Sequence, residues 1–126
     1  MPGDLATIAF EQAERAGIVR IEGEVDMSNA DRLLKELTAR VGVDPWLIMD
    51  LSGCSYVDSA GLSVIAQVDG RCRAAGSGLR LVVDPGSGVE RVLAMTRLNE
   101  ILNVDRTLEH AIESAANESP DRGRPT

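Results

Sequence analysis

The sequence predicts an α/β fold with a mixed, mostly parallel sheet of 4-5 strands and about four helices. Two observations carry this prediction. The chain begins with a pair of strand-like apolar segments, and it then alternates apolar runs with segments of amphipathic helical spacing. Such alternation is typical of parallel strands joined by helices that pack on the sheet. At 126 residues the chain is expected to form one domain with its own core.

Each element follows from apolar periodicity and from Gly, Pro or polar boundary signals. In chain order, we predict strands at 5–10 and 18–24, a helix at 30–41 and a strand at 46–51. A helix from about 59 to 75, a strand at 79–83, a short helix at 89–96, a brief strand or turn at 101–104 and a helix at 108–115 follow. Residues 1–116 are predicted to form the domain. The polar segment 117–126, with two prolines, is predicted to be a disordered tail.

Composition restricts the function. Apolar residues make up 44% and aromatic residues 2% of the chain, so the core must be aliphatic. A net charge of −7 argues against nucleic-acid binding, which needs clustered Lys and Arg. The acidic surface favours either a basic partner or simple solubility. With no 18-residue apolar span and no basic leader at the start, we expect a cytoplasmic protein without a membrane segment.

The two cysteines are too few and too irregularly spaced for a disulfide framework or a zinc site. Cys72 lies on the apolar stripe of a predicted helix and is expected to be buried. Cys54 lies near the loop described next, where a redox role stays open. We expect no metal and no cofactor.

The segment 51–65, which reads LSGCSYVDSAGLSVI, is the most informative part of the chain. It connects a predicted strand to a predicted helix through the turn Asp58-Ser59-Ala60-Gly61. We expect Ser59 to cap the first turn of that helix. The free amides and the dipole of a helix N-terminus also favour an anion, so a covalent phosphate at this position would act as a switch.

The sequence resembles the STAS domain family, and within it the stand-alone bacterial anti-sigma factor antagonists (anti-anti-sigma factors). Three motifs carry the resemblance. The segment 23–26 (GEVD) resembles the family's motif at the end of the second strand, 50–52 (DLS) resembles its motif at the next strand end, and 57–62 (VDSAGL) resembles its switch. The resemblance runs from about residue 5 to 116.

The resemblance implies partner switching. An unphosphorylated antagonist binds an anti-sigma factor, which is also a serine kinase of the histidine-kinase ATPase fold, and thereby releases a sigma factor. The kinase phosphorylates the switch serine, here Ser59, and the complex dissociates; a PP2C-type phosphatase restores binding. Ala60 stands where many members have a second hydroxyl, which leaves Ser59 as the candidate and Ser55 and Ser63 as weaker ones. We expect a monomer that pairs with its kinase.

The resemblance also gives a set of expected partner-binding residues: Asp26, Ser28, Asp58, Ser59, Ala60, Gly61 and Leu62. Several have two interpretations. Asp58 has either a functional role, orienting the Ser59 hydroxyl or contacting the kinase, or a structural role, capping the helix or holding the turn. Asp26 either contacts the partner or forms an Asx turn before Ser28. Gly61 is interpreted mainly as a residue that lets the helix start approach the neighbouring backbone.

Two other functions are compatible with parts of the sequence. Catalysis by Ser59 would need a base, but His110 is the only histidine and is expected to face solvent on the last helix. No GxSxG motif is present, so we expect that this protein is not an enzyme. The second alternative is a STAS accessory or scaffold module, such as the cytosolic subunit of a lipid-transport ABC system, in which the Ser59 loop contacts a partner without being phosphorylated.

Overall fold

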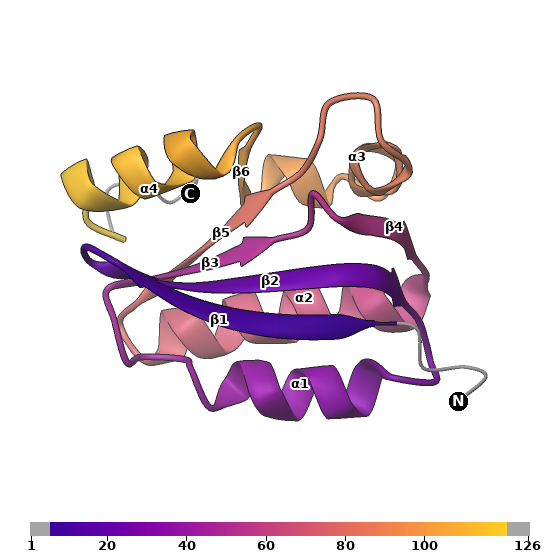
Figure 1. The fold of residues 1–126 in the computed structure, drawn as a ribbon, viewed down its shortest axis with the longest axis horizontal. Coiled ribbons are helices and arrows are strands. Elements are labelled where there is room, and N and C mark those ends of the chain that lie inside the picture. Colours follow the sequence, from indigo (N-terminus) through magenta and orange to yellow (C-terminus); the bar gives the residue numbers. More distant parts are fainter. Residues whose placement is uncertain (1–5, 121–126) are drawn as a thin grey trace.

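The computed structural model describes residues 6–120, which form a twisted sheet with helices on both faces (Figure 1). The strand order is β1-β2-β3-β5-β6, and β4 pairs with β2 outside this order. Within the described residues β1 and β2 pair antiparallel and the other strand pairs are parallel. The strands are β1 (Thr7–Ala13), β2 (Ala16–Val25), β3 (Trp46–Asp50), β4 (Cys54–Val57), β5 (Gly78–Val82) and β6 (Asn103–Asp105).

The helices are α1 (Ala30–Thr38), α2 (Ser59–Ala74), α3 (Gly88–Met95) and α4 (Leu108–Asn117), with a 3-10 turn, η1, at Leu98–Glu100. The predicted fold class, a mixed and mostly parallel sheet with four helices, is confirmed. Helix α2 ends at Ala74, close to the predicted end, and Gly76, directly after the C-cap, adopts φ +75°. Helix α1 ends at Thr38, three residues earlier than predicted.

Strand β4 was not predicted from the sequence. Strand β3 accompanies β2 as far as the pair Arg20–Asp50, and β4 then takes over beside β2 from Gly23 onward. The register between β2 and β4 shifts at Gly23 and Glu24. Four residues with an irregular register give little periodicity, so only the tertiary pairing identifies this strand. Its position matters because α2 begins immediately after it.

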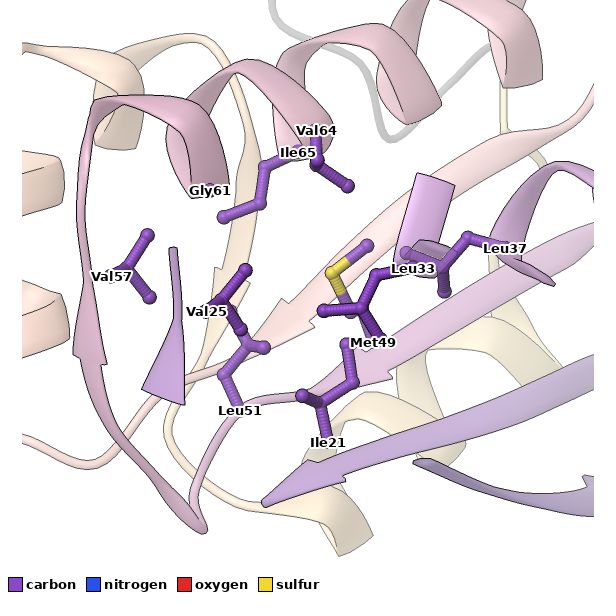
Figure 2. Close-up of a pocket in the computed structure, with 10 residues that line it drawn as sticks. All are labelled: Ile21, Val25, Leu33, Leu37, Met49, Leu51, Val57, Gly61, Val64 and Ile65. Carbon is purple, nitrogen blue, oxygen red and sulfur yellow. The ribbon is translucent and has the colours of Figure 1, made fainter. Parts of the chain in front are cut away.

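The main core lies between the sheet and the pair α1 and α2, which share one face of the sheet (Figure 1). Figure 2 shows Leu33 from α1 and Ile65 from α2 among the residues that line one small cavity with Ile21 and Met49 of the strands. The cavity among these side chains measures about 10 Å³, at the lower limit for one water molecule. This space is packed interior and cannot accept an organic ligand.

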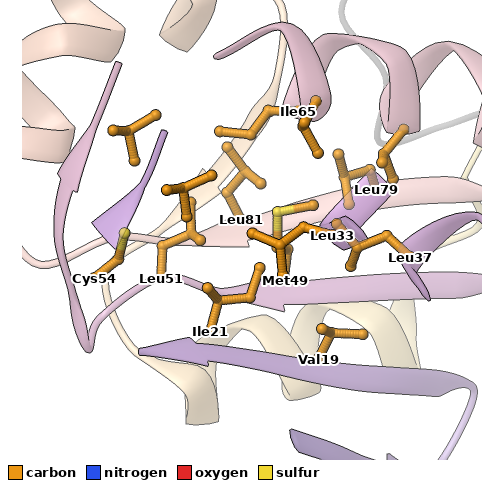
Figure 3. Close-up of a cluster of buried hydrophobic side chains, with 14 of the residues drawn as sticks. Val19, Ile21, Leu33, Leu37, Met49, Leu51, Cys54, Ile65, Leu79 and Leu81 are labelled. Carbon is orange, nitrogen blue, oxygen red and sulfur yellow. The ribbon is translucent and has the colours of Figure 1, made fainter. Parts of the chain in front are cut away.

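The same core continues along the sheet through Leu79 and Leu81 of β5 and reaches Cys54 of β4 (Figure 3). Cys72, predicted to be buried, has no exposed surface. The core is aliphatic, as the composition predicts, and it fixes α2 relative to β4. The start of α2 is therefore held by packing on one side and lies open on the other.

Helix α4 covers the opposite face of the sheet through a second, smaller core that contains Trp46 and Ala111. A buried ion pair supports this contact. The Nε of Arg80 lies 2.8 Å from Oδ2 of Asp105, and the guanidinium lies 4.9 Å from the centre of the Trp46 ring. His110 is exposed as predicted, although its Nδ1 lies 2.7 Å from Oδ1 of Asp105.

The predicted tail, 117–126, begins inside the folded part. Asn117 is the last residue of α4. The carbonyl oxygen of Glu118 accepts a hydrogen bond of 2.9 Å from the Trp46 indole, and Pro120 is buried. Residues 117–120 therefore belong to the domain rather than to a disordered tail. Residues 121–126 lie outside the described residues.

Candidate functional site

Asp58 forms the N-cap of α2, and its two carboxylate oxygens hold two different segments. Its Oδ1 accepts a hydrogen bond of 3.0 Å from the Gly61 amide, and its Oδ2 accepts one of 3.3 Å from the Met27 amide. The Asp58 amide in turn donates to the Val25 carbonyl at 3.1 Å. Asp58 thus connects the start of α2 with the loop between β2 and α1.

The prediction that Ser59 caps this helix is wrong. Asp58 has the extended backbone of an N-cap residue, and its charged oxygen reaches the Gly61 amide. Ser59 already occupies the first helical position. Of the two structural roles left open for Asp58, capping the helix and holding the turn, the geometry shows both.

The displacement of Ser59 from the cap leaves its hydroxyl free. Ser59 is exposed, and within residues 6–120 its side chain makes no hydrogen bond. The adjacent helix start carries the positive end of a 16-residue helix. An exposed, unbonded hydroxyl beside that positive end can be reached by another protein and can accept a phosphate.

The other serines near this point are engaged. The Ser28 hydroxyl bonds to Asp26, and the Ser52 hydroxyl donates to Asp50 at 2.7 Å. The Ser55 hydroxyl donates to the Gly23 carbonyl at 3.3 Å. The Ser63 hydroxyl accepts a hydrogen bond of 3.1 Å from the side-chain amide of Gln67. Ser59 therefore differs from its neighbours in the availability of its oxygen.

Asp26 holds the neighbouring loop by the Asx turn that its sequence context indicated. Its Oδ1 accepts from the Ser28 amide at 2.9 Å and from the Ser28 hydroxyl. Asn29, buried beneath it, donates to the Glu24 carbonyl at 2.8 Å and accepts from the Asp26 amide at 3.1 Å. Asn29 does not cap α1 with its side chain, because both ends of its amide group are used in this loop.

Gly61 permits the close approach of α2 to the sheet, as predicted. A Cβ atom there would lie 2.7 Å from Cγ1 of Val57 and 3.0 Å from the Val25 carbonyl oxygen. Figure 2 shows Val25 and Val57 beneath this first turn. Gly61 is buried, Ala60 and Leu62 are half-buried against the main core, and Ser28 is exposed together with Ser59.

Cys54 is a buried residue of β4. Burial raises the pKa of its thiol; hydrogen bonds with the backbone of Tyr56 and Val25 lower it, and the nearby Glu24 carboxylate raises it further. A raised pKa keeps the thiol protonated near neutral pH, and thiolate is the reactive form. The environment of Cys54 therefore disfavours the redox role that the sequence left open.

Two exposed apolar side chains on the segments next to this site, Met27 and Tyr56, were not predicted from the sequence. Met27 stands alone among polar neighbours in the turn 26–29 (DMSN), which was the signal available in the sequence. Tyr56 lies on the unpredicted strand β4, so its exposure could not be inferred. In residues 6–120 no acidic, His or Cys cluster suited to a metal ion occurs, and no helix there is long and apolar enough to span a membrane.

Comparison with known proteins identifies the family. The model of the STAS domain matches residues 7–111, so the chain belongs to the STAS domain family. Over 109 residues, 83% of this chain and 84% of the relative, it is 28% identical to anti-sigma-F factor antagonist RsfA of Mycobacterium tuberculosis. Over 71 residues it is 35% identical to osmosensory protein A of the same organism, matching 56% of this chain but only 44% of that relative.

A solved structure shows the same fold. The crystal structure of an anti-sigma factor antagonist from Mycobacterium paratuberculosis superposes with a TM-score of 0.83 at 24% identity. The superposition covers 93% of this chain and 98% of that protein. The elements that position Ser59, β4 and α2, thus belong to a fold that this family shares.

Proposed function

We propose that this protein is an anti-sigma factor antagonist. In the unphosphorylated form it binds an anti-sigma factor that is also a serine kinase of the histidine-kinase ATPase fold, and this frees a sigma factor. Phosphorylation of Ser59 ends the interaction, and a PP2C-type phosphatase restores it. The chain is a ligand and a substrate in this scheme, which operates in the cytoplasm, and the kinase supplies the catalysis.

One observation supports this proposal above the others: Ser59 presents a free hydroxyl, whereas Ser28, Ser52, Ser55 and Ser63 have bonded ones. In the kinase reaction the Ser59 oxygen bonds to the γ-phosphorus of ATP, the bond between the β- and γ-phosphates breaks, and ADP and a proton leave. The likeness to an anti-sigma-F factor antagonist over most of both chains supports the same role.

The switch acts on the contact and not on the fold. A phosphate adds roughly −1.5 to −2 charges. The dipole at the start of α2 favours that charge, whereas the Asp58 carboxylate opposes it, so the net effect on folding is small. In a partner interface the same charge loses its water and faces a surface shaped for a hydroxyl. A cost of about 3 kcal/mol there weakens binding roughly a hundredfold.

The experiment uses each ATPase-fold anti-sigma factor of the source genome, purified and incubated with this protein, ATP and Mg²⁺. We expect one kinase to add one phosphate group, which intact-mass analysis detects and peptide mapping assigns to Ser59. Ser59→Ala should abolish the mass gain. The matched control Ser63→Ala, four residues further along α2, should retain it. A phosphate that maps elsewhere, or none with any kinase, contradicts the proposal.

A further inference from the structure

Two large apolar side chains are exposed on the segments next to Ser59. Met27 is 82% exposed and Tyr56 is 51% exposed. Isolated exposed apolar residues are ordinary on protein surfaces. These two differ because both belong to the segments that position the free hydroxyl: Tyr56 stands three residues before Ser59 in β4, and Met27 lies in the loop that Asp58 holds.

The backbone at both positions is fixed, although the side chains are not covered. The Met27 amide donates to the Asp58 carboxylate that caps α2. On either side of Met27, the Ser28 amide donates to the Asp26 carboxylate. Tyr56 is paired with Glu24 in the parallel ladder between β4 and β2. An apolar group held on an ordered backbone can enter a partner without a large loss of backbone entropy. Met and Tyr are also enriched in protein interfaces.

The two segments that carry these residues bear charges of a single sign. Residues 21–31 and 51–70, which build the site, contain no Lys or Arg. The carboxylates in these two segments are Glu22, Glu24, Asp26, Asp31, Asp58 and Asp69. These segments combine exposed apolar side chains with carboxylates, so a complementary partner surface is apolar at its centre and basic at its rim.

Building on the proposed function, we infer that Met27 and Tyr56 are the apolar anchors of the docking surface for the anti-sigma factor. The partner receives them in an apolar depression bordered by Lys and Arg side chains. Ser59 follows the strand that carries Tyr56, and its neighbour Asp58 bonds the loop that carries Met27, so a phosphate on Ser59 would be close to both segments. The Met27 and Tyr56 side chains supply affinity for the anti-sigma factor, and phosphorylation of the Ser59 hydroxyl controls whether the complex forms.

The test measures the Kd for the anti-sigma factor by calorimetry with wild-type protein, Met27→Ala and Tyr56→Ala. Truncating an anchor should raise the Kd by about thirtyfold or more. The matched control is Met95→Ala, because Met95 is 77% exposed but lies at the end of α3; its Kd should equal that of the wild type. Raising NaCl from about 50 to about 500 mM should weaken wild-type binding several-fold, since the rim contacts are screened.

The outcomes separate this inference from the proposed function. If the wild type binds and Ser59→Asp does not, but Met27→Ala and Tyr56→Ala bind like the wild type, the anchors are refuted and the proposed function stands. If no anti-sigma factor of the source genome binds the wild type, both are refuted. If sedimentation shows a wild-type dimer that Met27→Ala dissociates, the surface serves a second copy of the chain and the inference is refuted.

Discussion

At the scale of single residues, the Asp58 side chain makes the hydrogen bonds that hold the site together, whereas the Ser59 side chain makes none within residues 6–120. The two carboxylate oxygens of Asp58 bond the Gly61 amide and the Met27 amide, so one side chain holds both segments of the candidate interface. This division of roles is consistent with a switch: the residue that is modified can change its charge without removing a contact on which the fold depends.

Asp58→Ala should lower the free energy of unfolding by about 1 kcal/mol or somewhat more, because the helix loses its cap and the Met27 amide loses its acceptor. Asp58→Asn keeps a good capping oxygen and should be less destabilising. Urea denaturation of the two variants and the wild type checks this. Equal stability of Asp58→Ala and the wild type would show that the cap contributes nothing.

At the scale of elements, the start of α2 depends on how closely the helix can approach the sheet. Gly61 sits on Val25 and Val57, where a Cβ atom would lie 2.7 Å from a Val57 methyl carbon. At Gly70, nine residues further along the same helix, the position that a Cβ would take has no atom within 4 Å from residues 6–120 outside the local helix backbone and the adjacent residues. The two glycines of one helix therefore have opposite requirements.

Gly61→Ala should destabilise the protein by about 1–3 kcal/mol, because the methyl group overpacks the contact with β2 and β4. Gly70→Ala should stabilise it by up to about 1 kcal/mol, because alanine favours the helix and meets open space. Thermal denaturation of both variants is the measurement. Two variants that shift the midpoint in the same direction would contradict this assignment of Gly61.

At the scale of the whole molecule, the sequence was sufficient for the class of fold and for most helices and strands. The apolar run before Asp50 and the helical spacing from Leu62 to Cys72 identify β3 and α2 because the pattern is local. Strand β4 was not predicted because it is recognised by its pairing with β2, which the local sequence pattern does not show. The ion pair of Arg80 and Asp105 likewise joins residues 25 positions apart, a separation that periodicity does not reveal.

The candidate site likewise has features that the sequence predicts and features that only the structure shows. The sequence pointed to Ser59 and Asp58 through a compact motif, but it favoured Ser59 as the helix cap and left capping by Asp58 as one alternative. Both residues can cap a helix, and only the backbone geometry shows that Asp58 does so. Met27 and Tyr56 were missed because exposure is a property of the folded surface and not of the motif.

The central claim is that phosphate on Ser59 changes a contact and leaves the fold intact. The direct measurement compares protein carrying phosphoserine at position 59 with unmodified protein, in Kd for the anti-sigma factor and in thermal midpoint. We predict a Kd raised about a hundredfold and midpoints that agree within about 2 °C. An unchanged Kd would contradict the switch, and a loss of binding that comes with a large drop in midpoint would show that the phosphate acts through the fold.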